Sequence, residues 1–145
     1  MLTMDQALRA IAALEAAWTQ DTEAIDALAG AGQGEEPLAA VVAEFVGEVL
    51  RGVALAVTGI TDLPEGQQRA AVAEFKKGIL ADMLAAVAGT FQRWAISAGS
   101  DIRPTRDLTV AGLAAILGFA VEGVDNHDGV KELFDGMRAQ AMARL

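Results

Sequence analysis

One stretch of twenty residues, 38–57, constrains the fold of this chain more than any other part of its sequence. Its apolar side chains point in nearly every direction around a helix, and only Glu44, Glu48 and Arg51 form a narrow polar strip, at spacings of four and three. A helix that is apolar almost all round has to be enclosed by its neighbours. We therefore predict that this helix is the centre of an all-α bundle.

The composition supports the same fold class. Hydrophobic residues make up 53% of the 145 positions, and many of them are alanine. Alanine has the highest helix propensity, and its small side chain lets helices approach closely. The length fits one domain. We expect a single-domain helical bundle of five to seven helices over residues 1–145.

The N-terminal part of the chain is expected to form two short helices. Thr3 and Gln6 have the spacing of a capping box, which satisfies free N–H groups at a helix start. Apolar positions then recur at helical spacing over 4–18 and 23–29. The polar residues 19–22 predict a break, although Ile25 follows Trp18 at a spacing that also permits one continuous helix.

The segments on either side of the central helix are bounded by glycine and proline. The glycines of 30–34 end the N-terminal helices. Residues 64–98 keep one apolar face and are expected to form a long helix with a kink or split at Gly89-Thr90. Pro104 disfavours a helical backbone at Arg103. The next helix is therefore expected over 107–122, and the last over 128–145, with Asp128 as its N-cap.

Charge is distributed unevenly along the chain. The formal net charge is −9, and residues 1–36 hold seven acidic residues and one arginine, whereas residues 63–104 have a net charge of +1. We expect an acidic N-terminal helical hairpin, 1–36, packed on a core formed by 37–145. The simplest interpretation is that the charged faces are solvated. The alternative is that the acidic hairpin lies against the basic face of the 64–98 helix, within one molecule or between two.

Few side chains are suited to catalysis. The chain has no cysteine, which excludes disulfides and thiolate chemistry, and it has one histidine, His127. A catalytic histidine needs a nucleophile and an orienting group, and a zinc site needs further nitrogen or sulfur ligands. Residues 124–129 resemble a calcium loop only in part, because Val124 would occupy the first ligand position. We expect no enzyme activity, no metal and no cofactor.

The carboxylates of Glu44 and Glu48 lie one turn apart on the central helix. Such pairs bind two metals in di-iron bundles, but those sites also need a Glu-x-x-His motif, which is absent here. An internal Glu48–Arg51 ion pair or a solvated strip is the simpler interpretation. The alternative is that Glu44, Glu48 and Arg51 make polar contacts that fix helix register across an interface.

The aromatic side chains are most simply interpreted as core residues. They could also line a cavity for an apolar small molecule between helices, which is a common location for ligands. The candidate lining residues are Phe45, Met83, Trp94 and Phe119.

No segment has the features of a targeting or membrane-spanning element. The N-terminus lacks a basic patch followed by an apolar run, and the uncharged stretch 108–121 is too short to cross a bilayer. Lysine and arginine are too sparse to indicate nucleic-acid binding. We expect a cytoplasmic protein that binds neither membrane nor nucleic acid.

One resemblance covers residues 89–123. Ala98-Gly99 ends a helix, Arg103-Pro104 follows, and Asp107 opens an apolar helix that contains Gly118. This pattern resembles the C-terminal half of TetR-type regulators, and the resemblance implies a helical domain that binds a ligand and dimerises. Residues 1–37 are acidic and lack the helix-turn-helix of that family, so the resemblance implies no DNA contact.

Three hypotheses about function follow, in decreasing order of support. The first is a non-enzymatic interaction module that forms a homo-oligomer, with a dimer as the first guess, or binds a protein partner. The second is a binder of an apolar small molecule in a cavity between helices. The third is an enzyme or metal protein that uses acidic side chains.

Overall fold

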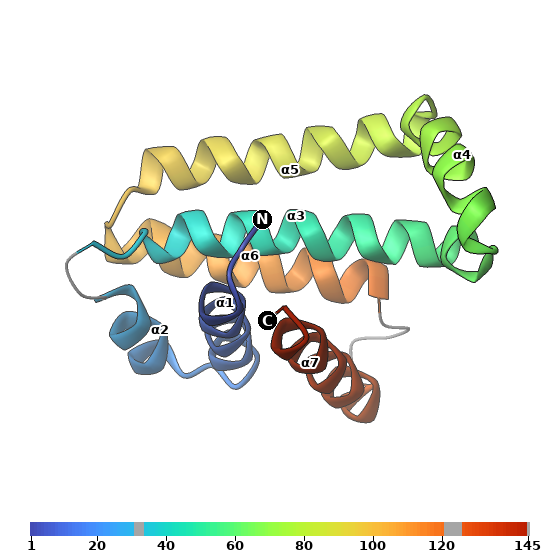
Figure 1. Cartoon of the computed structure of the whole chain (residues 1–145). Helices are drawn as coiled ribbons and strands as arrows, with labels where there is room; N and C mark the ends of the chain where they lie inside the picture. Colours follow the sequence, from blue (N-terminus) through green and yellow to red (C-terminus); the bar gives the residue numbers. More distant parts are fainter. Residues whose placement is uncertain (31–33, 121–125, 145) are drawn as a thin grey trace.

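The structure of the protein is a computed structural model that describes residues 1–30, 34–120 and 126–144. Within these ranges every regular element is helical, so the predicted all-α fold class is confirmed (Figure 1). The elements, in chain order, are α1 (Met4–Trp18), α2 (Thr22–Ala29), α3 (Leu38–Val57), the 3₁₀ helix η1 (Ile60–Asp62), α4 (Glu65–Lys76), α5 (Ile79–Ala98), α6 (Ile102–Ala120) and α7 (His127–Met142).

The helices form one bundle around α3 (Figure 1). Helix α3 packs against α5 on one side, against α6 behind it and against α1 below it, while α4 crosses its C-terminal end and connects to α5. Helix α7 packs mainly against α1. None of the described helices is both long enough and apolar enough to span a membrane.

Helix α3 is central, as its apolar surface predicts, but it is not enclosed along its whole length. In its first half Val41, Val42 and Val46 are fully buried. In its second half Gly52 is exposed, and the side chain of Val57 is 78% exposed. The prediction of an enclosed helix is therefore confirmed for the first half and wrong for the last turns, which are only partly covered.

Close packing between α3 and α6 depends on Gly112. A Cβ atom at this position would lie only 2.8 Å from Cγ2 of Val46. The missing side chain lets the two helices approach more closely than any larger residue would permit.

The break between α1 and α2 falls in the predicted polar segment. Gln20 has a φ of 57°, a left-handed conformation that a helix cannot continue through. Asp21 then caps α2 by accepting a hydrogen bond from the Ala24 N–H, at 3.1 Å. At the start of α1, Thr3 and Gln6 form the predicted capping box in both directions.

The long helix expected over 64–98 is two helices, and the predicted break at Gly89-Thr90 is wrong. The chain breaks at Gly78, whose extended backbone (φ −88°, ψ 163°) separates α4 from α5. Gly89 stays within α5, where the Thr90 hydroxyl donates a hydrogen bond to the Ala86 carbonyl. The physical difference is burial: α4 buries none of its residues, whereas α5 buries Leu84 and Phe91.

Helix α6 begins at Ile102, five residues earlier than predicted. The expectation that Pro104 keeps Arg103 out of a helix is wrong, because Pro104 lies in the first turn, where its missing N–H would have had no intrahelical partner. The hydroxyl of Thr105 donates a hydrogen bond to the Asp101 carbonyl across the same turn.

The last helix is also displaced from its predicted bounds. Its N-cap is Asn126, whose side chain accepts from the Gly129 N–H at 2.9 Å, so the prediction of Asp128 as the cap is wrong. The helix ends at Met142, before the predicted residue 145. His127 opens the helix, and its ring packs 5.5 Å from the ring of Trp18. Residues 124 and 125 of the considered calcium loop, and the predicted end of the preceding helix at 122, lie outside the described residues.

The acidic N-terminal helices are joined to arginines of α6 and α7. Asp26 pairs with Arg106, and Glu15 pairs with Arg138. The described acidic residues of α1 and α2 make no ion pair with the basic residues of α4 or α5, so the alternative in which the hairpin lies against that basic face within one molecule is wrong.

Candidate functional site

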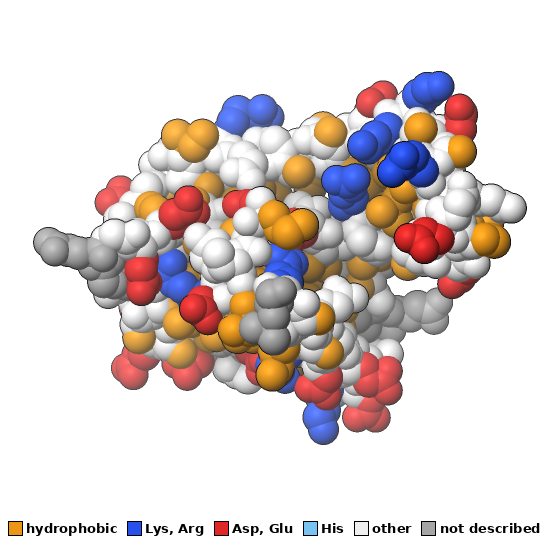
Figure 2. Space-filling view, viewed as in Figure 1, with side chains coloured by type: hydrophobic (Ala, Val, Ile, Leu, Met, Phe, Trp, Pro, Cys, Tyr) orange, Lys and Arg blue, Asp and Glu red, His pale blue; other side chains and the backbone are white. Residues whose placement is uncertain are grey.

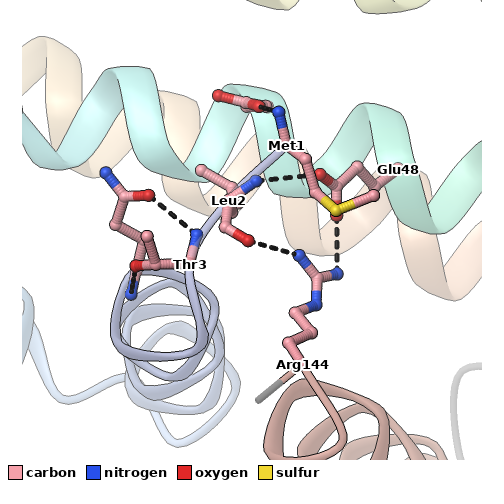
Figure 3. A network of polar contacts seen from close by, with 7 residues as sticks. Met1, Leu2, Thr3, Glu48 and Arg144 are labelled. Carbon is pink, nitrogen blue, oxygen red and sulfur yellow. Dashed lines mark hydrogen bonds and ion pairs between the residues drawn. The ribbon is translucent and has the colours of Figure 1, made fainter.

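The polar strip of α3 is part of a network that connects the first residues of the chain to the end of α7 (Figure 3). One carboxylate oxygen of Glu48 accepts a hydrogen bond from the Arg144 guanidinium at 2.6 Å, and the other accepts from the Leu2 backbone N–H at 3.4 Å. Arg144 also donates to the Leu2 carbonyl at 3.1 Å. The network therefore attaches two segments to the middle of α3.

The other two residues of the strip behave differently. Glu44 lies 3.2 Å from the amino group of Met1. Arg51 is exposed and makes no ion pair with any described residue. The predicted Glu48–Arg51 pair is not formed, because Glu48 pairs with Arg144 instead. Sequence reasoning missed this partner, since the helical pattern places Arg144 on the polar side of the last helix and does not show which helix it meets.

Both oxygens of Glu48 accept hydrogen bonds from other segments of the chain, so the contacts of this carboxylate link parts of the fold. Among the residues that the structure describes, no group of three or more His, Asp or Glu side chains could hold a metal ion.

A second charged pair joins α2 to α6. Nε of Arg106 donates to one carboxylate oxygen of Asp26 at 2.6 Å, and a terminal nitrogen contacts the other oxygen. The hydrogen bonds from Arg106 lower the pKa of Asp26 below its ordinary value, and the same contacts raise the pKa of Arg106. This bidentate geometry is the strong form of an arginine–carboxylate contact.

A groove of about 600 Å³ separates α3, from Phe45 onward, from α7. Phe45, Val49 and Val53 line it from α3, and Leu133 and Met137 line it from α7. Its polar lining includes the Glu48–Arg144 pair, Glu132 and Gln140. The volume lies within the roughly 300–1,000 Å³ typical of small-molecule sites.

The four residues predicted to line an apolar cavity do not come together. Phe45 is buried and lines the α3–α7 groove. Met83 and Phe119 are more than half exposed, and Trp94 is half-buried and stacks on Phe91 with ring centroids 6.1 Å apart. Only one of the predicted residues therefore belongs to this groove.

Exposed apolar side chains gather on α5 and α6. Of the nine large hydrophobic residues that are exposed in the described chain, three lie on α5 and three on α6. They are Ile79, Met83 and Ile96 on α5, and Ile102, Val110 and Phe119 on α6.

Two lines of exposed residues define what we call the α5/α6 face. The line on α5 consists of four residues at spacings of four, three and four, and the line on α6 consists of three residues at spacings of four. At these spacings each line follows one side of its helix. Both helices pack on α3 through their buried sides, which leaves these lines directed away from the bundle. The residues of the face, none of them charged, are Ile79, Met83, Ala86 and Thr90 on α5, and Val110, Ala114 and Gly118 on α6.

The chain matches no protein-family model, no curated protein and no solved structure. The resemblance of residues 89–123 to TetR-type regulators therefore remains a prediction, and a function for this chain has to be argued from its own side chains.

Proposed function

We propose that this protein is a non-enzymatic helical interaction module that self-associates through the α5/α6 face, with a dimer as the expected oligomer. The observation that carries the proposal is that six of the nine large hydrophobic residues exposed in the described chain lie on α5 and α6. Exposed apolar surface of this kind on a helix pair is typical of protein–protein interaction sites. The small residues Ala86, Ala114 and Gly118 would let a second pair of helices approach closely.

The charges around the face also favour contact between two copies. Asp82 and Arg93 are exposed on α5, and Arg103 and Asp107 are exposed on α6. Two acidic and two basic side chains sum to no net charge, so these four side chains add no net repulsion between two copies. A two-fold axis through the face would place α5 and α6 of both copies in a four-helix layer. Each copy would then contribute the same surface to the interface.

The experiment is size-exclusion chromatography with light scattering on the wild-type chain and two variants. Met83→Arg places a charge in the face, whereas Met142→Arg places the same charge at a side chain on α7 that is also 60% exposed. We expect wild type and Met142→Arg to elute as dimers and Met83→Arg as a monomer. A 15.0 kDa monomer for the wild type at high concentration, or a dimer for Met83→Arg, would contradict the proposal.

The α3–α7 groove favours a second function, binding of an apolar small molecule. Six apolar side chains line the groove, Ala56 included, and its volume suits a ligand. Gly136 also lines the groove and has no atom within 4 Å of a Cβ built on it, so Gly136→Leu introduces a side chain into the groove without crowding its Cβ. Gly66→Leu on α4 is the control, because Gly66 has equally open surroundings and lies outside the groove.

A ligand that binds the folded chain has to raise its melting temperature. Thermal unfolding against a library of hydrophobic compounds should therefore give shifts that Gly136→Leu abolishes and Gly66→Leu retains. If no compound stabilises the wild type, the groove is not a ligand site.

A further inference from the structure

A smaller trench lies between α3 and α5, on the opposite side of Glu48 from the α3–α7 groove. Its volume is about 370 Å³. The floor consists mostly of small and apolar side chains, and Arg51 and Lys76 stand at its rim. The apolar lining residues are Gly47, Phe75, Ala81, Leu84, Ala85 and Ala88.

The trench is short, because the residues that line it cover only a few helical turns of α3, α4 and α5. At one end α3 and α5 touch, since a Cβ atom at Gly47 would lie 3.5 Å from Cβ of Ala88. At the other end Phe75 and Lys76 of α4 line it. With a rise of 1.5 Å per residue, the α5 segment from Ala81 to Ala88 spans about 10 Å. This length accommodates a short alkyl chain better than a docked helix.

Basic side chains gather around this end of the molecule (Figure 2). Arg51 and Lys76 are exposed, and neither makes an ion pair with a described residue. Arg69 lies two helical turns from Lys76 on the same surface of α4. Lys77 pairs only loosely with Glu74, at 3.4 Å. The trench therefore has cations available at one end.

The neighbouring acids do not cancel this charge. Glu48 lines the trench, but its oxygens accept from Arg144 and Leu2. Asp82, in the first turn of α5, is the other acidic residue nearby, and it is exposed and does not line the trench. The net charge of −9 acts from further away, and at physiological salt it is screened over about 8 Å.

We infer that this trench binds a medium-chain carboxylate. The carboxylate would lie between Arg51 and Lys76, and the alkyl chain would follow the floor of small residues toward Gly47 and Ala88. An anionic head matches the cations of the rim, and a medium-length alkyl chain matches the length of the apolar floor. This site is separate from the α5/α6 face, and it goes beyond the proposed self-association.

The probe is octanoate, tested by isothermal titration and thermal unfolding of the full chain. Octanol supplies the same chain without charge, octyltrimethylammonium supplies the opposite charge, and acetate supplies the head alone. We expect saturable binding and stabilisation with octanoate, and binding at least about tenfold weaker with the other three. Equal binding of octanol or of the cation would overturn the assignment, as would the absence of saturable octanoate binding.

Variants locate the site. Arg51→Gln with Lys76→Gln removes both rim charges, and Arg93→Gln is the matched control, an exposed cation on α5 outside the trench. Ala85→Leu fills the trench at an exposed position and leaves its charges in place. Octanoate binding should weaken about tenfold in the first variant and in Ala85→Leu, and remain unchanged in Arg93→Gln.

Two results would contradict this localisation. Undiminished octanoate binding in the double variant would place the site elsewhere. An acidic amphipathic peptide that binds through Arg51 and Lys76 where octanoate does not would make the trench a docking site for protein.

Discussion

Glu48 and Asp26 are the two carboxylates on which the described contacts between distant helices most depend. Glu48 joins α3 to Arg144, which follows the end of α7, and Asp26 joins α2 to Arg106 of α6. Both pairs are partly buried, with side-chain exposures between 24% and 39%. Partial burial strengthens such contacts relative to fully exposed ion pairs, which contribute little.

Replacement of Glu48 by Gln removes the charge that binds Arg144. We expect the free energy of unfolding to fall by about 1–3 kcal/mol, the usual range for a partly buried hydrogen bond to a charged group. Urea unfolding measures the change, and Glu132→Gln, an exposed acid on α7, should change it by less than about 0.5 kcal/mol. Equal effects of the two substitutions would show that the network adds nothing to stability.

The lowered pKa of Asp26 predicts a dependence of stability on pH. Because the folded-state pKa lies below the unfolded value of about 3.9, the contribution of Asp26 is present above that value. It is lost as the pH falls through the lower folded-state pKa. Asp26→Asn should therefore lose less stability than wild type on acidification below about pH 4, as measured by urea unfolding.

Asp62→Asn provides the control for this titration. Asp62 is exposed in η1 and forms no ion pair among the described residues. On acidification below about pH 4, the free energy of unfolding of Asp62→Asn should fall as it does for the wild type. If the stability of Asp26→Asn fell with pH as steeply as that of the wild type, the assignment of this pH dependence to Asp26 would be contradicted.

Local contacts at this scale could be predicted from the sequence, and distant ones could not. Thr3 and Gln6 were predicted as a capping box because both partners lie within one turn. Glu48 was identified as a polar residue on an apolar helix, but its partner lies 96 positions away. Only the packing of α7 against α1 determines that Arg144 reaches it.

At the scale of helices, periodicity predicted the existence of the elements better than their ends. Gly78 and Gly89 have the same intrinsic preference, yet only Gly78 breaks a helix. The difference comes from tertiary packing, because α5 continues along α3 through Gly89, whereas α4 turns across the end of α3. Pro104 likewise marked a helix end in the sequence, and it lies in a first turn in the fold.

The contact of α3 with α6 can be tested at Gly112. Gly112→Ala adds a methyl group 2.8 Å from Val46, and we expect a loss of about 1–3 kcal/mol in unfolding free energy from overpacking. Gly52→Ala in α3 has no atom within 4 Å of the new methyl group, and it should gain about 0.5–1 kcal/mol from helix propensity. Stabilisation by Gly112→Ala would show that the two helices are not in close contact there.

At the scale of the whole molecule, the helices distribute charge and apolar surface to different sides. Acidic residues of α1 and α2 pair with α6 and α7, and the α5/α6 face has no charge. The all-α class was predictable from alanine content and periodicity. The grooves were not, because they depend on how far α7 and α4 stand from α3, which no local pattern determines.

Self-association would make thermal stability depend on protein concentration. If the folded dimer is the stable form, mass action raises the melting temperature of wild type as its concentration increases. Met83→Arg should remove this dependence, and Met142→Arg should keep it. Calorimetry over a wide concentration range measures the effect, and a constant melting temperature for wild type would contradict self-association.

The network around Glu48 also bears on how fast the chain folds and unfolds. Its links span 46, 96 and 142 positions, so each requires closing a long loop before it can form. Contacts of this kind are expected after the folding transition state, where they slow unfolding and leave the folding rate almost unchanged. The pairing of Arg144 with Glu48 would then set the lifetime of the native state more than the speed at which that state is reached.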